Sequence, residues 1–174
     1  MYGKALGNGY AITAVVGKRS VMEAAQKTFI SSTFWTERIG PTAALKTLEI
    51  MEREKSWETI TALGNYMQGK WKFSSKKHEV NIKISGLPSI SSFSFENKDA
   101  QKFKTYLTQE FLKKGYLATT SFYASTAHTH KVIDNYSEVL DEIFFNIKKC
   151  IVGELNIDNL LDSKIAHNGF QRLN

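Results

Sequence analysis

The sequence has few of the residues that cross-link a chain or carry it into a membrane. It contains one cysteine and two prolines in 174 residues, so no disulfide can form within the chain. No apolar run approaches the roughly 20 residues that cross a bilayer. The opening MYGKALGNGY lacks the basic region and apolar stretch of a signal peptide. We therefore expect a cytoplasmic protein with no membrane partner. The cysteine, Cys150, lies in the apolar-periodic run IFFNIKKCIV and is interpreted as a small buried hydrophobe.

Acidic residues are outnumbered by basic ones, which gives a net charge of +6 and a pI near 9.3. The lysines are dispersed, and the densest group stands at the end of a predicted helix, where cations suit the helix dipole: Lys70, Lys72, Lys76 and Lys77. No nucleic-acid-binding motif accompanies this charge. A solvated face is the favoured interpretation, and nucleic-acid binding ranks last among the alternatives.

The first 80 residues combine one predicted strand with helices. Residues 10–17, YAITAVVG, predict a buried strand, and a short helix is expected over about 20–27. The next helix, with Pro41 near its start, presents a predicted apolar face: Ile39, Ala43, Leu45, Leu48 and Met51. A further helix over about 56–76 carries apolar residues at a spacing that favours packing over a cofactor stack: Trp57, Ile60, Leu63, Met67 and Trp71. These elements have no sheet of their own to cover, so we expect this part to be incomplete.

From residue 80 the pattern changes to an α+β unit. VNIKISG and SISSFSFE alternate apolar with polar residues and predict two adjacent strands. A helix over about 99–114 is expected to end at Gly115, and YLATTSFYAS predicts another strand. Thr129 is the predicted N-cap of a last long helix, whose inward residues are Ile133, Tyr136, Leu140, Ile143, Phe144, Ile147 and Ile151.

The segment GKALGNGY places three glycines around Lys4. Such glycines allow a tight backbone and a close approach to a bound group. The spacing matches neither a Walker loop nor a dinucleotide fingerprint, so an exposed lysine in a flexible stretch stays open as an alternative.

A resemblance to a known family favours a reactive lysine. GKALGNGY followed by AITAVVGK resembles the class III aminotransferase segment that carries the Schiff-base lysine, and Lys4 matches that lysine. The similarity is to members of the glutamate-1-semialdehyde 2,1-aminomutase type. One departure is Ala11, where the family usually has proline. The resemblance implies pyridoxal 5′-phosphate as cofactor and Lys4 as the catalytic residue.

A second segment is similar to the same family. Ser31-Ser32-Thr33-Phe34 resembles the motif whose threonine reaches across a dimer interface to the phosphate of the neighbouring subunit's cofactor. The resemblance implies cofactor-binding roles for Thr33 and Ser32. Hydroxyl and backbone N–H groups before a helix suit an anion. An ordinary Ser/Thr capping stretch is the alternative.

The resemblance is collinear over essentially the whole chain. TERIGPTAALKTLEIMEREKSW, ASTAHTHKVIDNYSEVLDEIF and HNGFQRL are similar to later family segments in the same order. The implied fold is α/β plus α+β, the C-terminal part of a fold-type I pyridoxal-phosphate-dependent transferase. Residues 1–79 would be the end of the cofactor-binding large domain with inter-domain helices, and 80–174 the small C-terminal α+β domain.

The implied activity is amino-group transfer, or an internal amino shift, on a small-molecule amino donor and acceptor. Family members are homodimers, and their N-terminal portion supplies the pyridinium carboxylate, a phosphate-binding loop and a stacking aromatic. We therefore expect this chain to be a fragment that is inactive alone. A truncated reading frame, one half of a split enzyme with a separate N-terminal half as its partner, and an incompletely recorded protein stay open as its origin. The alternative is a non-catalytic remnant that acts as a protein-interaction module.

His128 and His130 suggest a metal pair or an acid–base group when read in isolation. No carboxylate or cysteine stands at a recognised ligand spacing. We predict that His128 is a structural residue near the helix cap, and that there is no metal site.

Overall fold

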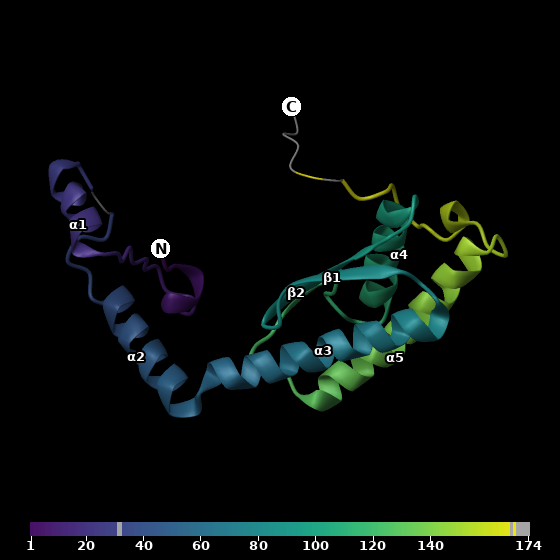
Figure 1. Cartoon of the computed structure of the whole chain (residues 1–174), viewed down its shortest axis with the longest axis horizontal. Coiled ribbons are helices and arrows are strands. Elements are labelled where there is room, and N and C mark those ends of the chain that lie inside the picture. The colour runs from purple at the N-terminus through teal and green to yellow at the C-terminus, as the bar shows by residue number, and fades with distance from the viewer. Residues whose placement is uncertain (31–32, 168, 170–174) are drawn as a thin grey trace. The chain divides into compact units, whose positions relative to one another are not determined.

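The computed structural model describes residues 1–30, 33–167 and 169 of the 174 (Figure 1). The chain divides into two compact units, Met1–Ser56 and Trp57–Asn174. This division precedes residue 79 because helix α3 (Ser56–His78) packs its apolar face into the core of the second unit. The functional boundary between residues 79 and 80 stays a prediction.

The N-terminal unit contains short helices and one long one. They are the 3₁₀-helix η1 (Lys4–Leu6), α1 (Arg19–Met22), η2 (Glu23–Lys27) and α2 (Ile39–Glu54). The helices expected over 20–27 and from residue 39 are therefore confirmed. The apolar face predicted for α2 is exposed within this unit, since Ile39, Leu45 and Leu48 are 50–71% exposed. Gly40 and Ala44 are instead the buried residues among those described in α2, since no described element of this unit covers its larger apolar side chains.

The predicted buried strand over residues 10–17 is also wrong. The segment makes one isolated antiparallel bridge, between Tyr2 and Ala14. Val15 and Val16 remain 60% and 63% exposed. A strand needs a ladder partner along its length, and the described residues of this unit offer only Tyr2.

The C-terminal unit is built on a three-stranded antiparallel sheet of order β1-β2-β3. The strands are β1 (Ile82–Leu87), β2 (Ile90–Phe95) and β3 (Ser121–Tyr123), at the places that alternation predicted. In β2 the buried residues alternate: Ser91, Phe93 and Phe95. The turn after β1 passes so close to α3 that a Cβ on Gly64 would lie 1.8 Å from the Pro88 carbonyl oxygen.

Helices α4 (Ala100–Lys113) and α5 (His130–Ile151) complete this unit, followed by η3 (Ile157–Asn159). The predicted cap is confirmed, since Thr129 Oγ1 accepts a hydrogen bond from the Val132 N–H. Helices α3 and α5 lie side by side and run in the same direction (Figure 1). The polar contacts between them follow both sequences in order: Tyr66 with Asp134, Lys77 with Asp141, and Glu79 with Lys148.

The core of the C-terminal unit is aromatic and closed. Trp71 is fully buried, donates its indole N–H to Tyr136 Oη at 3.2 Å and meets the Phe93 ring edge-on. The Phe111 and Tyr136 rings stack with centroids 4.5 Å apart. Burial raises the pKa of Tyr136 well above its usual range. The six predicted inward residues of α5 from Ile133 to Ile147 are buried, whereas Ile151 is 38% exposed.

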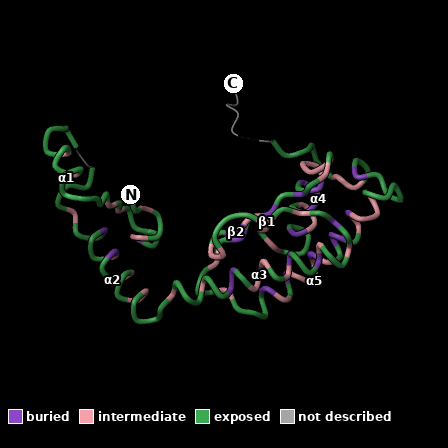
Figure 2. The backbone as a smooth tube through the Cα atoms, viewed as in Figure 1, coloured by how far each residue is buried: buried purple, intermediate pink, exposed green. Residues whose placement is uncertain are grey.

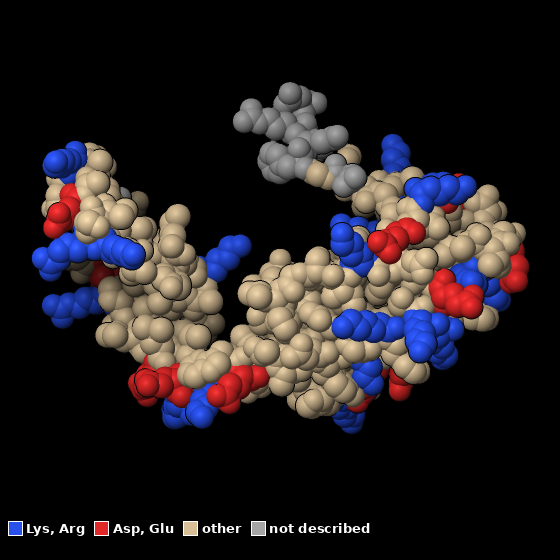
Figure 3. All heavy atoms as spheres, viewed as in Figure 1, with Lys and Arg blue, Asp and Glu red and all other residues tan. Residues whose placement is uncertain are grey.

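Cys150 packs against this core while partly buried, as interpreted from the sequence, and burial raises the pKa of its thiol. No helix among the described residues is long and apolar enough to cross a membrane. Acidic residues lie beside many of the lysines on the face shown in Figure 3. Lys70, from the densest lysine group, is paired with Asp134 at 2.6 Å.

Candidate functional site

Lys4 lies in a closed bend of the N-terminal unit. Tyr2 and Ala14 exchange two backbone hydrogen bonds of 2.7 and 2.8 Å, which tie the two ends of the bend together. Within it, the backbone of Lys4 has a φ of 44°. A left-handed conformation at a non-glycine residue costs on the order of 1–3 kcal/mol and concentrates at functional sites. The backbone of this lysine is therefore held by its surroundings.

Two of the glycines around Lys4 are required by the geometry. Gly7 is buried, and a Cβ there would lie 2.1 Å from the Tyr10 carbonyl oxygen. Gly9 has a φ of 107°, which side chains rarely allow. The segment GKALGNGY thus forms a tight turn.

The Lys4 side chain is exposed and lines an open hollow of about 910 Å³. The other lining residues are mainly apolar: Tyr10, Ala11, Ile12, Thr13, Val15, Val21, Met22, Ala25, Ile30, Phe34, Trp35, Glu37 and Pro41. Among the described lining residues, Lys4 and Glu37 carry the charges. The hollow can therefore hold a group with a flat apolar body against a single amine.

Glu37 is already engaged as the cap of α2. Its carboxylate accepts hydrogen bonds from the backbone N–H groups of Ile39 and Gly40. Helix N-termini favour such an anion. The sequence analysis missed this residue, although an acidic side chain immediately before a predicted helix is a recognised capping signal.

The predicted cofactor-binding hydroxyls are not gathered around Lys4. Thr33 is exposed in the turn 33–36 and is absent from the residues that line the Lys4 hollow. Ser32 lies outside the described residues. The structure thus brings Lys4 together with an apolar hollow and leaves Thr33 outside it.

His128 lies at the start of α5, in the C-terminal unit. Its Nδ1 accepts the Ser125 N–H at 3.0 Å and lies 3.2 Å from Ser125 Oγ, and its ring leans on Phe122. These contacts agree with the predicted structural role near the helix cap. In the part of the chain that the structure describes, no group of three or more metal-ligating side chains is found.

Comparison with known families adds a match over most of the chain. The profile of the family described as "Aminotransferase class-III" matches residues 1–151. A solved structure of the PLP internal aldimine form of Sphingopyxis sp. MTA144 FumI protein superposes with a TM-score of 0.77 at 24% identity. The superposition covers 91% of this chain and 39% of the FumI chain, and it shows that the two have the same fold over this part.

Curated relatives are longer than this chain. A 3-aminobutyryl-CoA aminotransferase of Cloacimonas acidaminovorans is 34% identical over 63% of the chain and 27% of its own length. An aminopentol aminotransferase of Sphingopyxis macrogoltabida is 26% identical over 80% of this chain and 33% of its own length. A glutamate-1-semialdehyde 2,1-aminomutase of Caldivirga maquilingensis is 26% identical over 84% of this chain and 38% of its own length. The chain therefore spans about a third of the length of these relatives.

Proposed function

This chain belongs to the class III aminotransferase family, and we propose that Lys4 is the amine through which it holds pyridoxal 5′-phosphate for amino-group transfer. The observation that supports the proposal is the bend itself. The bend places Lys4, whose backbone is left-handed, in the wall of a largely apolar hollow of about 910 Å³. The side chain of Lys4 supplies a primary amine there.

The residues of the hollow fit part of this cofactor. The Lys4 amine suits the aldehyde, and apolar neighbours such as Tyr10 and Ile12 suit the ring. Glu37 does not suit the pyridine nitrogen, because its carboxylate is bound to the α2 N-terminus. The carboxylate for that nitrogen would therefore come from residues other than those described in the lining of this hollow.

When bound, the cofactor supplies an electron sink. Lys4 supplies the proton chemistry. A solvated lysine has a pKa of about 10.4, so the amine must lose its charge to act as a nucleophile or base. In its uncharged form, Lys4 Nζ would accept a proton from the substrate carbon that bears the amino group and would donate it back later in the transfer. The left-handed backbone at Lys4 would fix the direction in which its side chain leaves the bend.

Thr33 and Ser32 are assigned to phosphate binding in a neighbouring subunit of a homodimer. The exposure of Thr33 away from the Lys4 hollow supports this part of the proposal. An exposed hydroxyl is accessible to a group that another molecule presents. The proposed substrates are a small-molecule amino donor and acceptor, of the kind named for the aminomutase and aminotransferase relatives. The cytoplasmic location stays a prediction.

Covalent labelling tests the role of Lys4. The chain is incubated with pyridoxal 5′-phosphate, reduced with borohydride and mapped by mass spectrometry. We expect the pyridoxyl label on Lys4, and its loss in Lys4→Arg but not in the matched control Lys27→Arg. Lys27 stands in the same unit and is absent from the lining of the hollow. Equal labelling of Lys4, Lys18 and Lys27 would contradict the proposal.

A second function, a non-catalytic interaction module, is favoured by the exposed apolar side chains of the N-terminal unit. Phe29, Ile30 and Trp35 are 93%, 74% and 79% exposed. Exposed apolar patches mark interaction sites. Under this alternative, labelling is scattered over the lysines, while light scattering shows a complex with a partner chain.

A further inference from the structure

Residues 156–167 follow the family match, which ends at residue 151, and lie along α4. We call this segment the strap. One of its side chains, Ile157, is buried at 6% exposure, and Leu160 and Leu161 pack partly against the core. The other described residues of the strap are exposed. Its attachment therefore depends on a single buried anchor and on its contacts with α4.

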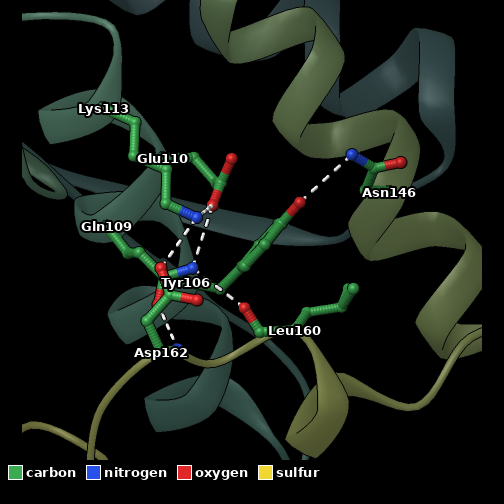
Figure 4. Close-up of polar contacts among 7 residues, drawn as sticks. All are labelled: Tyr106, Gln109, Glu110, Lys113, Asn146, Leu160 and Asp162. Atoms are coloured by element: carbon green, nitrogen blue, oxygen red, sulfur yellow. Dashed lines mark hydrogen bonds and ion pairs between the residues drawn. The ribbon is translucent and has the colours of Figure 1, made fainter.

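Most of those contacts come from one stripe of α4: Gln101, Thr105, Gln109 and Lys113. The four residues are spaced four apart, so their side chains share a face of the helix. Gln109 donates to the Leu160 carbonyl and accepts from the Asp162 N–H, both at 2.8 Å (Figure 4).

Farther along the stripe, Thr105 Oγ1 accepts the Ala166 N–H at 3.1 Å. Gln101 donates to the Ala166 carbonyl at 2.7 Å. Most of the stripe therefore binds backbone groups of the strap. The strap runs antiparallel to α4, since residues 160 to 166 meet residues 109 to 101.

Charge reinforces the same attachment. Lys113 lies 2.8 Å from Asp162 and 2.8 Å from Glu110, and these two carboxylates raise the pKa of Lys113 (Figure 4). Lys102 lies 2.7 Å from Asp158. Each pair includes exposed groups and is worth little by itself. The strap is thus held by several weak polar contacts in series.

We propose that the strap opens and closes on α4 as one unit while the core of the C-terminal unit stays folded. Regions with few buried apolar contacts and exposed hydrogen bonds open at lower free energy than the core around them. In the closed state the strap and α4 line an open hollow of about 510 Å³. Opening exposes the α4 side chains that bind the strap backbone in the closed state: Gln101, Thr105 and Gln109.

Amide hydrogen exchange of the full chain, followed by NMR, tests this proposal. The amides of Asp162 and Ala166 donate to α4 side chains, so their exchange reports opening of the strap. We expect both to exchange at least about tenfold faster than the amides of Ile143 and Ile147 in the buried face of α5.

The variant Thr105→Val separates a cooperative strap from independent contacts. It removes the acceptor of the Ala166 amide and leaves the acceptor of Asp162, Gln109, intact. A unit that opens together predicts exchange at Asp162 about two- to tenfold faster, the effect of one lost hydrogen bond. Thr108→Val is the matched control, because Thr108 Oγ1 bonds the Lys104 carbonyl of its own helix.

Thr105 is buried, so Gln101→Leu serves as a second variant that removes strap contacts from a less buried position. It is expected to accelerate both strap amides and to leave Ile143 and Ile147 unchanged. Unchanged exchange at Asp162 in both variants would overturn the proposal. Equal exchange of strap and core amides in the unaltered chain would also overturn it, because the strap would then be an integral part of the fold.

Discussion

The two units of this chain differ in how far they bury their apolar residues (Figure 2). In the C-terminal unit they form one closed cluster that contains Trp71, Phe111 and Phe144, all at or near 0% exposure. In the described part of the N-terminal unit, Ala44 is the one buried hydrophobic side chain, while Phe29 and Trp35 are mostly exposed.

The residues that stabilise the fold and the candidate reactive lysine therefore lie in different units. Burial of apolar surface is the dominant favourable term in folding, so the C-terminal unit contains the means to stabilise itself. The N-terminal unit carries the candidate lysine on strained backbone, with little burial to offset the strain. We infer that the geometry around Lys4 depends on what covers the hollow, whereas the sheet and helices after residue 57 do not.

Paired tryptophan variants are expected to show the largest difference between the units. Trp71→Ala removes a fully buried ring and its hydrogen bond to Tyr136, at an expected cost of about 3–5 kcal/mol in the free energy of unfolding. Trp35→Ala alters a 79% exposed side chain and should change that free energy by less than about 0.5 kcal/mol. Urea unfolding followed by far-UV circular dichroism measures both. Similar changes in the free energy of unfolding for the two variants would contradict the difference in burial between the two units.

Two glycines of α3 give the next largest effect and test how tightly the C-terminal unit is packed. A Cβ at Gly64 meets the Pro88 carbonyl oxygen at 1.8 Å, whereas a Cβ at Gly69 has no atom within 4 Å. Gly64→Ala should therefore destabilise by about 1–3 kcal/mol. Gly69→Ala should stabilise by up to about 1 kcal/mol, because alanine favours the helix. Thermal unfolding of the two variants checks the opposite signs, and a stable Gly64→Ala protein would show that the turn moves freely.

The same contrast explains how much of the fold the sequence could predict. In the C-terminal unit, apolar periodicity identified β1, β2, α4 and α5, because each element finds its partner within the unit. In the N-terminal unit the same reasoning predicted a buried strand over 10–17, which was wrong, and an apolar face on α2, which stays exposed. Periodicity indicates which face of a helix or strand is apolar. That face is buried only where another element packs against it.

The candidate site was only partly accessible to sequence reasoning. Lys4 and its glycines could be identified because a tight bend has a local signature, and the family resemblance gave the lysine a role. The role of Glu37 as a cap was not predicted. The absence of Thr33 from the lining of the hollow agrees with its assignment to a neighbouring subunit. The strap was also missed, since Gln109 meets Leu160 across a separation of 51 residues and glutamine carries no local signal for such a contact.

Acid sensitivity should give the smallest effect and should also differ between the units. In the C-terminal unit, burial disfavours the charged form of Asp141, but hydrogen bonds from Lys77 and His78 outweigh it and the pKa of Asp141 is lowered from 3.8. A carboxyl group with a lowered folded-state pKa stabilises the fold above its unfolded pKa, and this contribution is lost as the pH falls through the folded value. Asp141→Asn should therefore cost about 1 kcal/mol at pH 7, and the difference from the unaltered chain should shrink below about pH 4.

The control for this titration lies in the N-terminal unit. The hydrogen bond from Lys46 also lowers the pKa of Glu49, but both side chains are more than half exposed. Solvent screens such a pair, so Glu49→Gln should leave the urea midpoint unchanged at pH 7, 5 and 3. A cost of Asp141→Asn that stays constant over these pH values would mean that the amide disturbs packing between α3 and α5. In that case the ion pair would contribute nothing to the stability of the C-terminal unit.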